Sequence, residues 1–189
     1  MVDGGEYKTE DLYDGTFTVS LPQQFRNIRD KSYVPDNQEV FSSISDNQSF
    51  MFEINEPPEV IDTEVARYYF EDLAEYNESS ESSIIATAAI ENSEMPDLDP
   101  SIPKFYLEGK QRIVPGKSSH PPEDVHIFLA IIRLKEVNSD VMISLNIPHK
   151  EESIEEYTEK VQNFSSVFKA VIGSFKVVSL DVFKDAMHE

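Results

Sequence analysis

The stretch YVPDNQEVF, from Tyr33 to Phe41, indicates how the first half of the chain is built. Pro35 fixes its own backbone angle and favours an extended conformation at Val34. Asp36 and Asn37 favour a turn, because their side chains form hydrogen bonds with nearby backbone groups. The stretch therefore predicts a turn that leads directly into a β-strand.

Alternating apolar and polar residues predict strands on both sides of this turn. Residues 16–21 form one such strand, and the strand that begins in the motif runs to residue 44. Turn-forming residues at 45–47 separate it from a third alternating segment at 50–54, so these two strands predict a hairpin. Residues 23–31 favour a helical turn around Phe25 and Ile28.

The middle of the chain predicts one helix and two further strands. Residues 63–76 carry apolar side chains at helical spacing, and Asp62 or Thr63 is a candidate cap. The β-branched segment 84–90 predicts a strand. Residues 104–114 predict another, interrupted at Gly109.

The last third of the chain holds the longest apolar patterns. Residues 125–135 are almost continuously apolar, which predicts a central strand covered on both faces and paired in a hairpin with 141–147. Ser153 and Glu156 have the spacing of a capping box. A stripe of apolar residues from Ile154 to Phe175 then predicts a long helix packed on the sheet.

These patterns together predict a single α+β domain over residues 1–189, with residues 1–11 as a loose N-terminal tail. We expect a three-layer sandwich in which a mostly antiparallel sheet of about six strands has helices on both faces. A chain of this length buries roughly 70% of its unfolded surface, enough for one sizeable core.

The charge balance restricts the kinds of partner. The 36 acidic and 16 basic residues give a formal net charge of −20. Such a surface repels nucleic acids and anionic membranes and favours a basic protein partner. We expect a monomer that binds neither nucleic acid nor membrane.

Cysteine is absent, which excludes disulfides and thiolate metal sites. The N-terminal residues resemble neither a secretory signal nor a transit peptide, so a soluble protein of the nucleus and cytoplasm is expected.

Motifs for catalysis are absent or incomplete. GKSS at 116–119 ends like a phosphate-binding loop, but Gln111 stands where that motif needs its first glycine. The four histidines share no ligand spacing, and His126 is expected to be packed within a strand. Acidic pairs such as Asp97 with Asp99, or Glu151 with Glu152, are typical of solvated surfaces. We expect neither an enzyme nor a cofactor or metal site.

Four segments, in order, resemble the Ran guanine nucleotide release factor family, also called the Mog family. They are LYDG (12–15), YVPDNQEVF (33–41), RYYFEDLAE (67–75) and IIRLKEVNSDVMISLNIP (131–148). The resemblance implies a Mog/PsbP-like fold, an antiparallel sheet of about six strands between helices. It also implies a non-enzymatic protein that binds the small GTPase Ran, releases its nucleotide and holds the nucleotide-free form during nuclear import.

The resemblance also implies which residues bind Ran. Matched by position in SFMFEINE, the acidic residues of the family correspond to Glu53 and Glu56. Strand parity predicts that Glu53 is exposed, and Glu56 is expected at the same rim. From the YVPDNQEVF motif, Gln38 and Glu39 are interface candidates, whereas Asp36 either caps the turn or contacts the partner.

Three residues depart from the family pattern: Asp14 replaces a glycine, Asn27 replaces an aspartate and Ser32 replaces an arginine. Each change alters the surface offered to Ran if it lies there. The alternatives to Ran binding are a small-molecule or lipid-binding module, or a scaffold, on the same fold. A ligand-binding module would require a deep, largely apolar pocket with convergent polar groups.

Overall fold

The computed structural model describes residues 5–29, 34–43, 45–113, 121–150 and 152–185. Its strands are β1 (Tyr7–Leu12), β2 (Phe17–Pro22), β3 (Phe25–Asn27), β4 (Gln38–Ser43), β5 (Ser49–Asn55), β6 (Glu81–Ala89), β7 (Lys104–Ile113), β8 (Glu123–Leu134), β9 (Ser139–Pro148) and β10 (Lys176–Val177). Its α-helices are α1 (Val65–Tyr76), α2 (Ile154–Gly173) and α3 (Asp181–Asp185), and its 3₁₀ turns are η1 (Asp62–Glu64), η2 (Asn92–Glu94) and η3 (Lys135–Val137).

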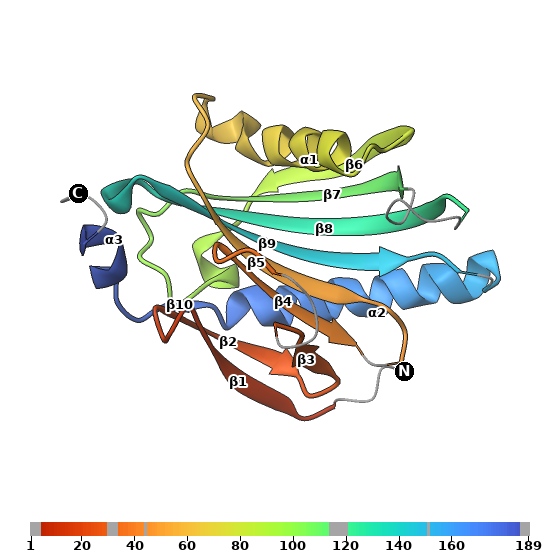
Figure 1. The fold of residues 1–189 in the computed structure, drawn as a ribbon, viewed down its shortest axis with the longest axis horizontal. Coiled ribbons are helices and arrows are strands. Elements are labelled where there is room, and N and C mark those ends of the chain that lie inside the picture. The colour runs from red at the N-terminus through yellow and green to blue at the C-terminus, as the bar shows by residue number, and fades with distance from the viewer. Residues whose placement is uncertain (1–4, 30–33, 44, 114–120, 151, 186–189) are drawn as a thin grey trace.

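Most of the strands form one large antiparallel sheet of seven strands in the order β3-β4-β5-β9-β8-β7-β6. A smaller sheet of β1, β2 and β10 lies below it in Figure 1. Helix α1 lies on one face of the large sheet, and α2 lies on the other. The predicted single-domain, three-layer α+β sandwich is confirmed.

The central strands β8 and β9 explain this layering, because their side chains are buried on both faces. In β8, Phe128 and Ile132 join the core cluster on the α2 side. Ile127, Leu129 and Ile131, which point to the opposite face, join the cluster under α1. The continuously apolar segment therefore is a central strand paired with β9, as its sequence predicts.

Helix α2 begins at the predicted capping box. The Ser153 hydroxyl accepts the Glu156 N–H at 3.2 Å, and the Glu156 carboxylate accepts the Ser153 N–H at 2.9 Å. Phe164 and Phe168 of the apolar stripe are buried against the sheet and the small β1-β2-β10 sheet. Ile154, which was expected on the stripe, is 79% exposed, so the buried face begins one turn later.

Several local predictions are wrong. The expected loose tail forms β1 from Tyr7 onward, because it pairs along its whole length with β2. The expected helical turn around Phe25 is instead strand β3, which pairs with β4 and buries Phe25. Neither Asp62 nor Thr63 caps α1, whose first residue follows Glu64 without a side-chain cap.

Gly109 does not interrupt β7, which pairs continuously with β8 from Lys104 to Ile113. Glycine is needed there for space. A Cβ atom at this position would lie 2.6 Å from the Phe70 ring of α1 and 2.8 Å from the Ser83 carbonyl oxygen. The absence of a side chain lets α1 approach the sheet closely.

We expect Gly109→Ala to lower the free energy of unfolding by about 1–3 kcal/mol, since an added methyl group must displace a buried ring and a backbone carbonyl. Urea unfolding followed by circular dichroism measures the loss. Lys110→Ala, at the exposed neighbouring position, is the control and should change stability by less than about 0.5 kcal/mol. Equal stability of the two variants would contradict the steric role of Gly109.

Candidate partner-binding surface

The turn between β1 and β2 is attached to the start of the β4–β5 hairpin through Tyr13. Tyr13 has a φ of 50°, a left-handed conformation that is rare for an aromatic residue. Its N–H donates to the Glu39 carboxylate at 2.7 Å. Its hydroxyl lies 2.8 Å from the Asn37 carbonyl oxygen and 2.7 Å from that of Phe52. These bonds hold the strained turn against both strands of the hairpin.

Glu39 is buried and holds the turn in place, so the structure does not put it at an open surface as the interface prediction requires. It is only 5% exposed. Besides Tyr13, its carboxylate accepts the Asn27 side-chain amide at 3.1 Å. The physical reason is strand parity, because Glu39 lies opposite Phe52 and points to the same side as Phe41, toward the core.

Gln38 and Glu53 lie on the opposite face of the hairpin and form a direct pair. They are register partners, and the Gln38 amide donates to the Glu53 carboxylate at 2.9 Å. The next pair along, Val40 with Met51, is also half-buried. Helix α1 packs on β6, β7 and β8, so this face of β4 and β5 is only partly covered. The structure thus brings Gln38 and Glu53 together at a partly open surface.

Glu53 is held in an environment that does not neutralise its charge. Burial raises the pKa of its carboxyl group, and the nearby Asp72 raises it further, while the hydrogen bond from Gln38 opposes the shift. Within the described residues, no ion pair involves Glu53. An ionised Glu53 is therefore a partly desolvated anion that has no cationic partner in the described part of the chain.

Asp36 and Glu56 are both exposed, at the same end of the hairpin. Asp36 sits in the turn closed by the bond from the Gln38 N–H to the Pro35 carbonyl at 2.9 Å. Asn37 links this turn to the end of β5, because its side chain donates to the Ile54 carbonyl at 3.2 Å. We call Asp36, Gln38, Glu53 and Glu56 the acidic rim.

Two of the departures from the family pattern also fall near this rim. Asp14 is exposed in the turn fixed by Tyr13, and its φ of 54° is one that aspartate tolerates. Asn27 is exposed as well, and its side-chain amide donates to the buried Glu39 carboxylate at 3.1 Å. Ser32, like the GKSS segment at 116–119 and Glu151, lies outside the described residues.

Arg133 of β8 anchors the loop that carries Glu56. Its guanidinium donates to the Val60 and Pro58 carbonyl oxygens, each at 3.2 Å. It also binds the Asp62 carboxylate at 2.9 Å and the buried Asp140 at 3.2 Å. Sequence reasoning missed this role, because nothing in the local pattern shows that a central strand meets a distant loop.

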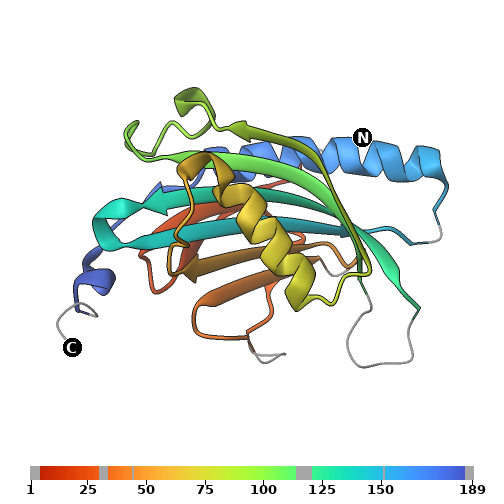
Figure 2. The same cartoon turned by 90° about the horizontal axis from the view of Figure 1, so that it is seen from above.

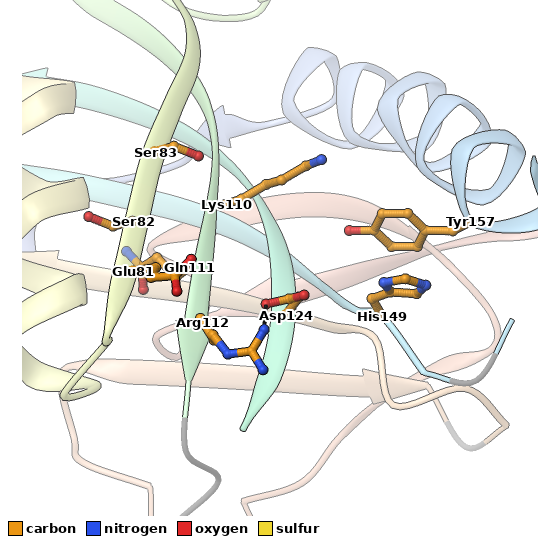
Figure 3. Close-up of a pocket in the computed structure, with 9 residues that line it drawn as sticks. All are labelled: Glu81, Ser82, Ser83, Lys110, Gln111, Arg112, Asp124, His149 and Tyr157. Atoms are coloured by element: carbon orange, nitrogen blue, oxygen red, sulfur yellow. Dashed lines mark hydrogen bonds and ion pairs between the residues drawn. The ribbon is translucent and has the colours of Figure 1, made fainter. Parts of the chain in front are cut away.

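A polar hollow of about 300 Å³ lies near the start of β6, on another part of the molecule (Figure 3). Its lining consists mostly of charged and polar side chains: Glu81, Ser82, Ser83, Lys110, Gln111, Arg112, Asp124, His149 and Tyr157. Arg112 and Asp124 pair at 3.2 Å, and the His149 and Tyr157 rings stack at 4.1 Å. The hollow does not have the apolar lining that the small-molecule or lipid alternative requires.

The described residues were also compared with what a catalytic histidine, a metal site or a membrane-spanning helix requires. His126 is 3% exposed, contacts Phe128 and pairs with Glu108 at 2.7 Å, which confirms that it is packed. Burial lowers the pKa of its imidazole.

Among the residues that the structure describes, no three acidic or histidine side chains are placed to hold a metal ion. In the same residues, no helix has the length and apolar character of a membrane span.

The sequence and the fold resemble those of known proteins. Residues 10–148 match the family model described as "Ran-interacting Mog1 protein". The chain belongs to the Mog1 family. A relative from Dictyostelium discoideum, "Probable ran guanine nucleotide release factor", is 26% identical over 94% of this chain and 96% of its own length. The predicted family is thereby confirmed.

A second Mog1 relative is the "Nuclear import protein MOG1" of Saccharomyces cerevisiae, 26% identical over 93% of this chain and 84% of its own. The solved structure of the yeast Ran-binding protein Mog1p superposes with a TM-score of 0.75 at 24% identity, covering 95% of this chain and all of that one. A cyanobacterial PsbP gives a TM-score of 0.60 at 14% identity, over 93% and 95% of the two chains. The Mog/PsbP-like fold is confirmed.

Truncation of Glu39 and of Glu53 should lower stability by different amounts. We expect Glu39→Ala to lower the free energy of unfolding by about 1–3 kcal/mol, because it leaves the Tyr13 N–H and the Asn27 amide without their acceptor. Glu53→Ala should cost less than about 1 kcal/mol at neutral pH. Urea unfolding of both variants measures the difference.

The pH dependence of stability provides a further check on Glu53. Its pKa is raised in the folded state, so its ionisation opposes folding, and this cost appears as pH rises through the ordinary and then the raised pKa. The Glu53→Gln variant should lose less stability than the unmodified protein as pH rises over this interval. A steeper loss in the variant would show that Glu53 is stabilised by an internal partner.

Arg133→Met should lower the free energy of unfolding by about 3–5 kcal/mol, because it leaves the Asp140 carboxylate buried without its cation. Lys135→Met is the matched control, since Lys135 binds the same Asp62 at 2.7 Å but is 62% exposed in its side chain. We expect that control to lose less than about 1 kcal/mol. Similar losses in urea unfolding would show that Arg133 does not anchor the loop.

Proposed function

We propose that this protein binds the small GTPase Ran, promotes release of its guanine nucleotide and stabilises the nucleotide-free form, in support of nuclear protein import. The names of its Mog1 relatives support this activity over most of the chain's length. The structural observation that carries the proposal is Glu53, a partly desolvated carboxylate positioned by Gln38 at a partly open face.

The rim offers the chemistry that nucleotide release requires. Small GTPases hold the nucleotide phosphates with a lysine and a magnesium ion. A carboxylate directed at those cationic groups competes with the phosphates for them. The unpaired charge of Glu53 makes it suited to this competition, because a cation from the partner would meet an anion that has no other counter-charge among the described residues.

The energetics require more than passive capture of empty Ran. Nucleotide binding at nanomolar to picomolar Kd corresponds to about 12–16 kcal/mol. A release factor must favour the nucleotide-free state by a comparable coupling free energy, which acts reciprocally between partner and nucleotide. The factor therefore binds loaded Ran first and weakens its hold on the nucleotide. The net charge of −20 would speed encounter with a basic surface.

Within the rim we assign different roles. Glu53 and Glu56 supply the charge that meets Ran, and Gln38 orients Glu53. Asp36, exposed in the adjoining turn, adds negative charge at the edge of the contact. Val40 and Met51 supply the apolar part of the same surface.

The remaining properties are part of the same proposal. The protein acts by binding, without catalysing a covalent reaction and without a cofactor. It works as a monomer in the nucleus and cytoplasm and binds neither nucleic acid nor membrane, in keeping with its acidic surface.

Release of a fluorescent guanine nucleotide from purified Ran tests the function. We expect the protein to accelerate release and to form a stable complex with nucleotide-free Ran. The double variant Glu53→Ala with Glu56→Ala should slow release at least tenfold, equivalent to about 1.4 kcal/mol of lost interaction, with its thermal stability nearly unchanged.

Glu71→Ala with Glu75→Ala is the matched control, because it removes two exposed carboxylates from the outer side of α1. It should release nucleotide at nearly the rate of the unmodified protein. An unmodified protein that neither accelerates release nor binds empty Ran would refute the proposal and leave the scaffold alternative. Equal slowing in both double variants would show that general charge, not the rim, is responsible.

A further inference from the structure

Strand β6 forms a long free edge of the large sheet. It pairs with β7 on one side, and in the described part of the chain no strand pairs with its other side. The edge is nine residues long, whereas β3 at the opposite edge has three. The unpaired N–H and carbonyl groups of such an edge are able to pair with another chain.

The composition of β6 lacks the features that usually protect an edge. From Ser82 to Ala89 the sequence is SSIIATAA, with no charged residue and no proline. Natural edge strands commonly carry lysine, proline or inward-pointing charges, which prevent pairing with other chains. Apart from Ile84, every residue of β6 is exposed. The edge is therefore accessible as well as unprotected.

A bulge determines which part of this edge is regular. The register with β7 shifts between Ile84 and Ala86, and the extra residue, Ile85, is 51% exposed. Beyond the bulge, Ala86 to Ala89 pair regularly with Glu108 to Phe105. Their small side chains allow a neighbouring strand to approach closely. Ile85 adds an apolar contact at one end of this regular segment.

Charge indicates what kind of chain would fit there. Glu91 and Glu94 are exposed directly beyond the regular segment, and Glu78 and Glu81 precede the bulge. Among the described residues, two cations pair in register with β6: Arg112 with Glu81, its guanidinium already bound to Asp124 at 3.2 Å, and Lys110 with Ser83. Both flanks therefore favour lysine or arginine in an approaching chain.

A second copy of this protein fits the edge less well. Antiparallel pairing of two copies centred on Ala86 to Ala89 would bring Glu81 of one copy toward Glu94 of the other. Each copy also carries a net charge of −20, so the approach is opposed at long range as well.

We infer that the β6 edge is a docking site for an extended segment of a partner protein, with small or β-branched residues at its centre and basic residues at both ends. The segment would add a strand beside Ala86 to Ala89. Strands β7, β8 and β9 separate β6 from β5 and the acidic rim, so the two surfaces are able to act at the same time.

The test uses a synthetic peptide, Lys-Lys-Val-Thr-Val-Thr-Lys-Lys, titrated into the isotopically labelled full chain and followed by NMR. We expect saturable shifts and slowed amide exchange concentrated at Ala86 to Ala89. A peptide with glutamate in place of each lysine should bind more weakly, and added salt should reduce the difference between the two.

Thr87→Lys places a like charge opposite the lysine peptide and should weaken binding about fivefold, equivalent to about 1 kcal/mol. Ala88→Lys is a second variant, for use if Thr87→Lys lowers thermal stability. Thr9→Lys, at an exposed position of β1, is the control, because it changes the net charge by the same amount at a distance from β6. Nucleotide release from Ran should be unaffected by Thr87→Lys, which separates this inference from the proposed function.

Three outcomes would overturn the inference. The first is equal binding of the lysine and glutamate peptides, or no saturable binding of either. The second is an equal effect of Thr87→Lys and Thr9→Lys on peptide binding, which would show that the overall charge of the protein, not the β6 edge, attracts the peptide. The third is self-association in light scattering that Thr87→Lys abolishes, which would assign the edge to a second copy of this chain.

Discussion

The structure depends on the need of β8 for apolar cover on both faces. Between Val125 and Ile132 this strand has apolar side chains on both faces, so a layer must lie on each side of the sheet. On one side, α2 and the small sheet provide that cover over a long stretch. On the other, the twelve residues of α1 and Val60 of the preceding loop provide it. A helix about 10 Å wide covers only two or three strands spaced by about 4.8 Å. The partly open face of β4 and β5 is a consequence of that mismatch.

This incomplete cover explains why two glutamates close together in the hairpin have opposite roles. Glu39 faces the fully covered side, where its charge binds the Tyr13 N–H and the Asn27 amide. Glu53 faces the partly covered side, where burial raises its pKa and only hydrogen bonds compensate. The first carboxylate contributes to the fold. The second opposes folding slightly when it is ionised, which fits the binding role that we propose for it.

The elements that follow from periodicity were predictable, because periodicity reports burial directly. The continuously apolar β8 and the regular stripe of α2 are examples. Strand β3 was not predictable, because three residues are too few to show a period and its pairing with β4 is a tertiary contact. Within the site, the pairing of Gln38 with Glu53 follows from the hairpin. The burial of Glu39 was also predictable, since it shares strand parity with Phe41.

The contacts made by Tyr13 and by Arg133 could not be predicted from the sequence, because each residue joins segments that lie far apart in it. Both sets of contacts nevertheless hold the acidic rim in place. Tyr13 fixes the turn that precedes β4 against β5, and Arg133 fixes the loop that follows β5. A rim fixed at both ends loses little conformational entropy when a partner binds. More of the interaction energy between rim and partner is then available to weaken the partner's hold on its nucleotide, and this is the quantity that a release factor has to supply.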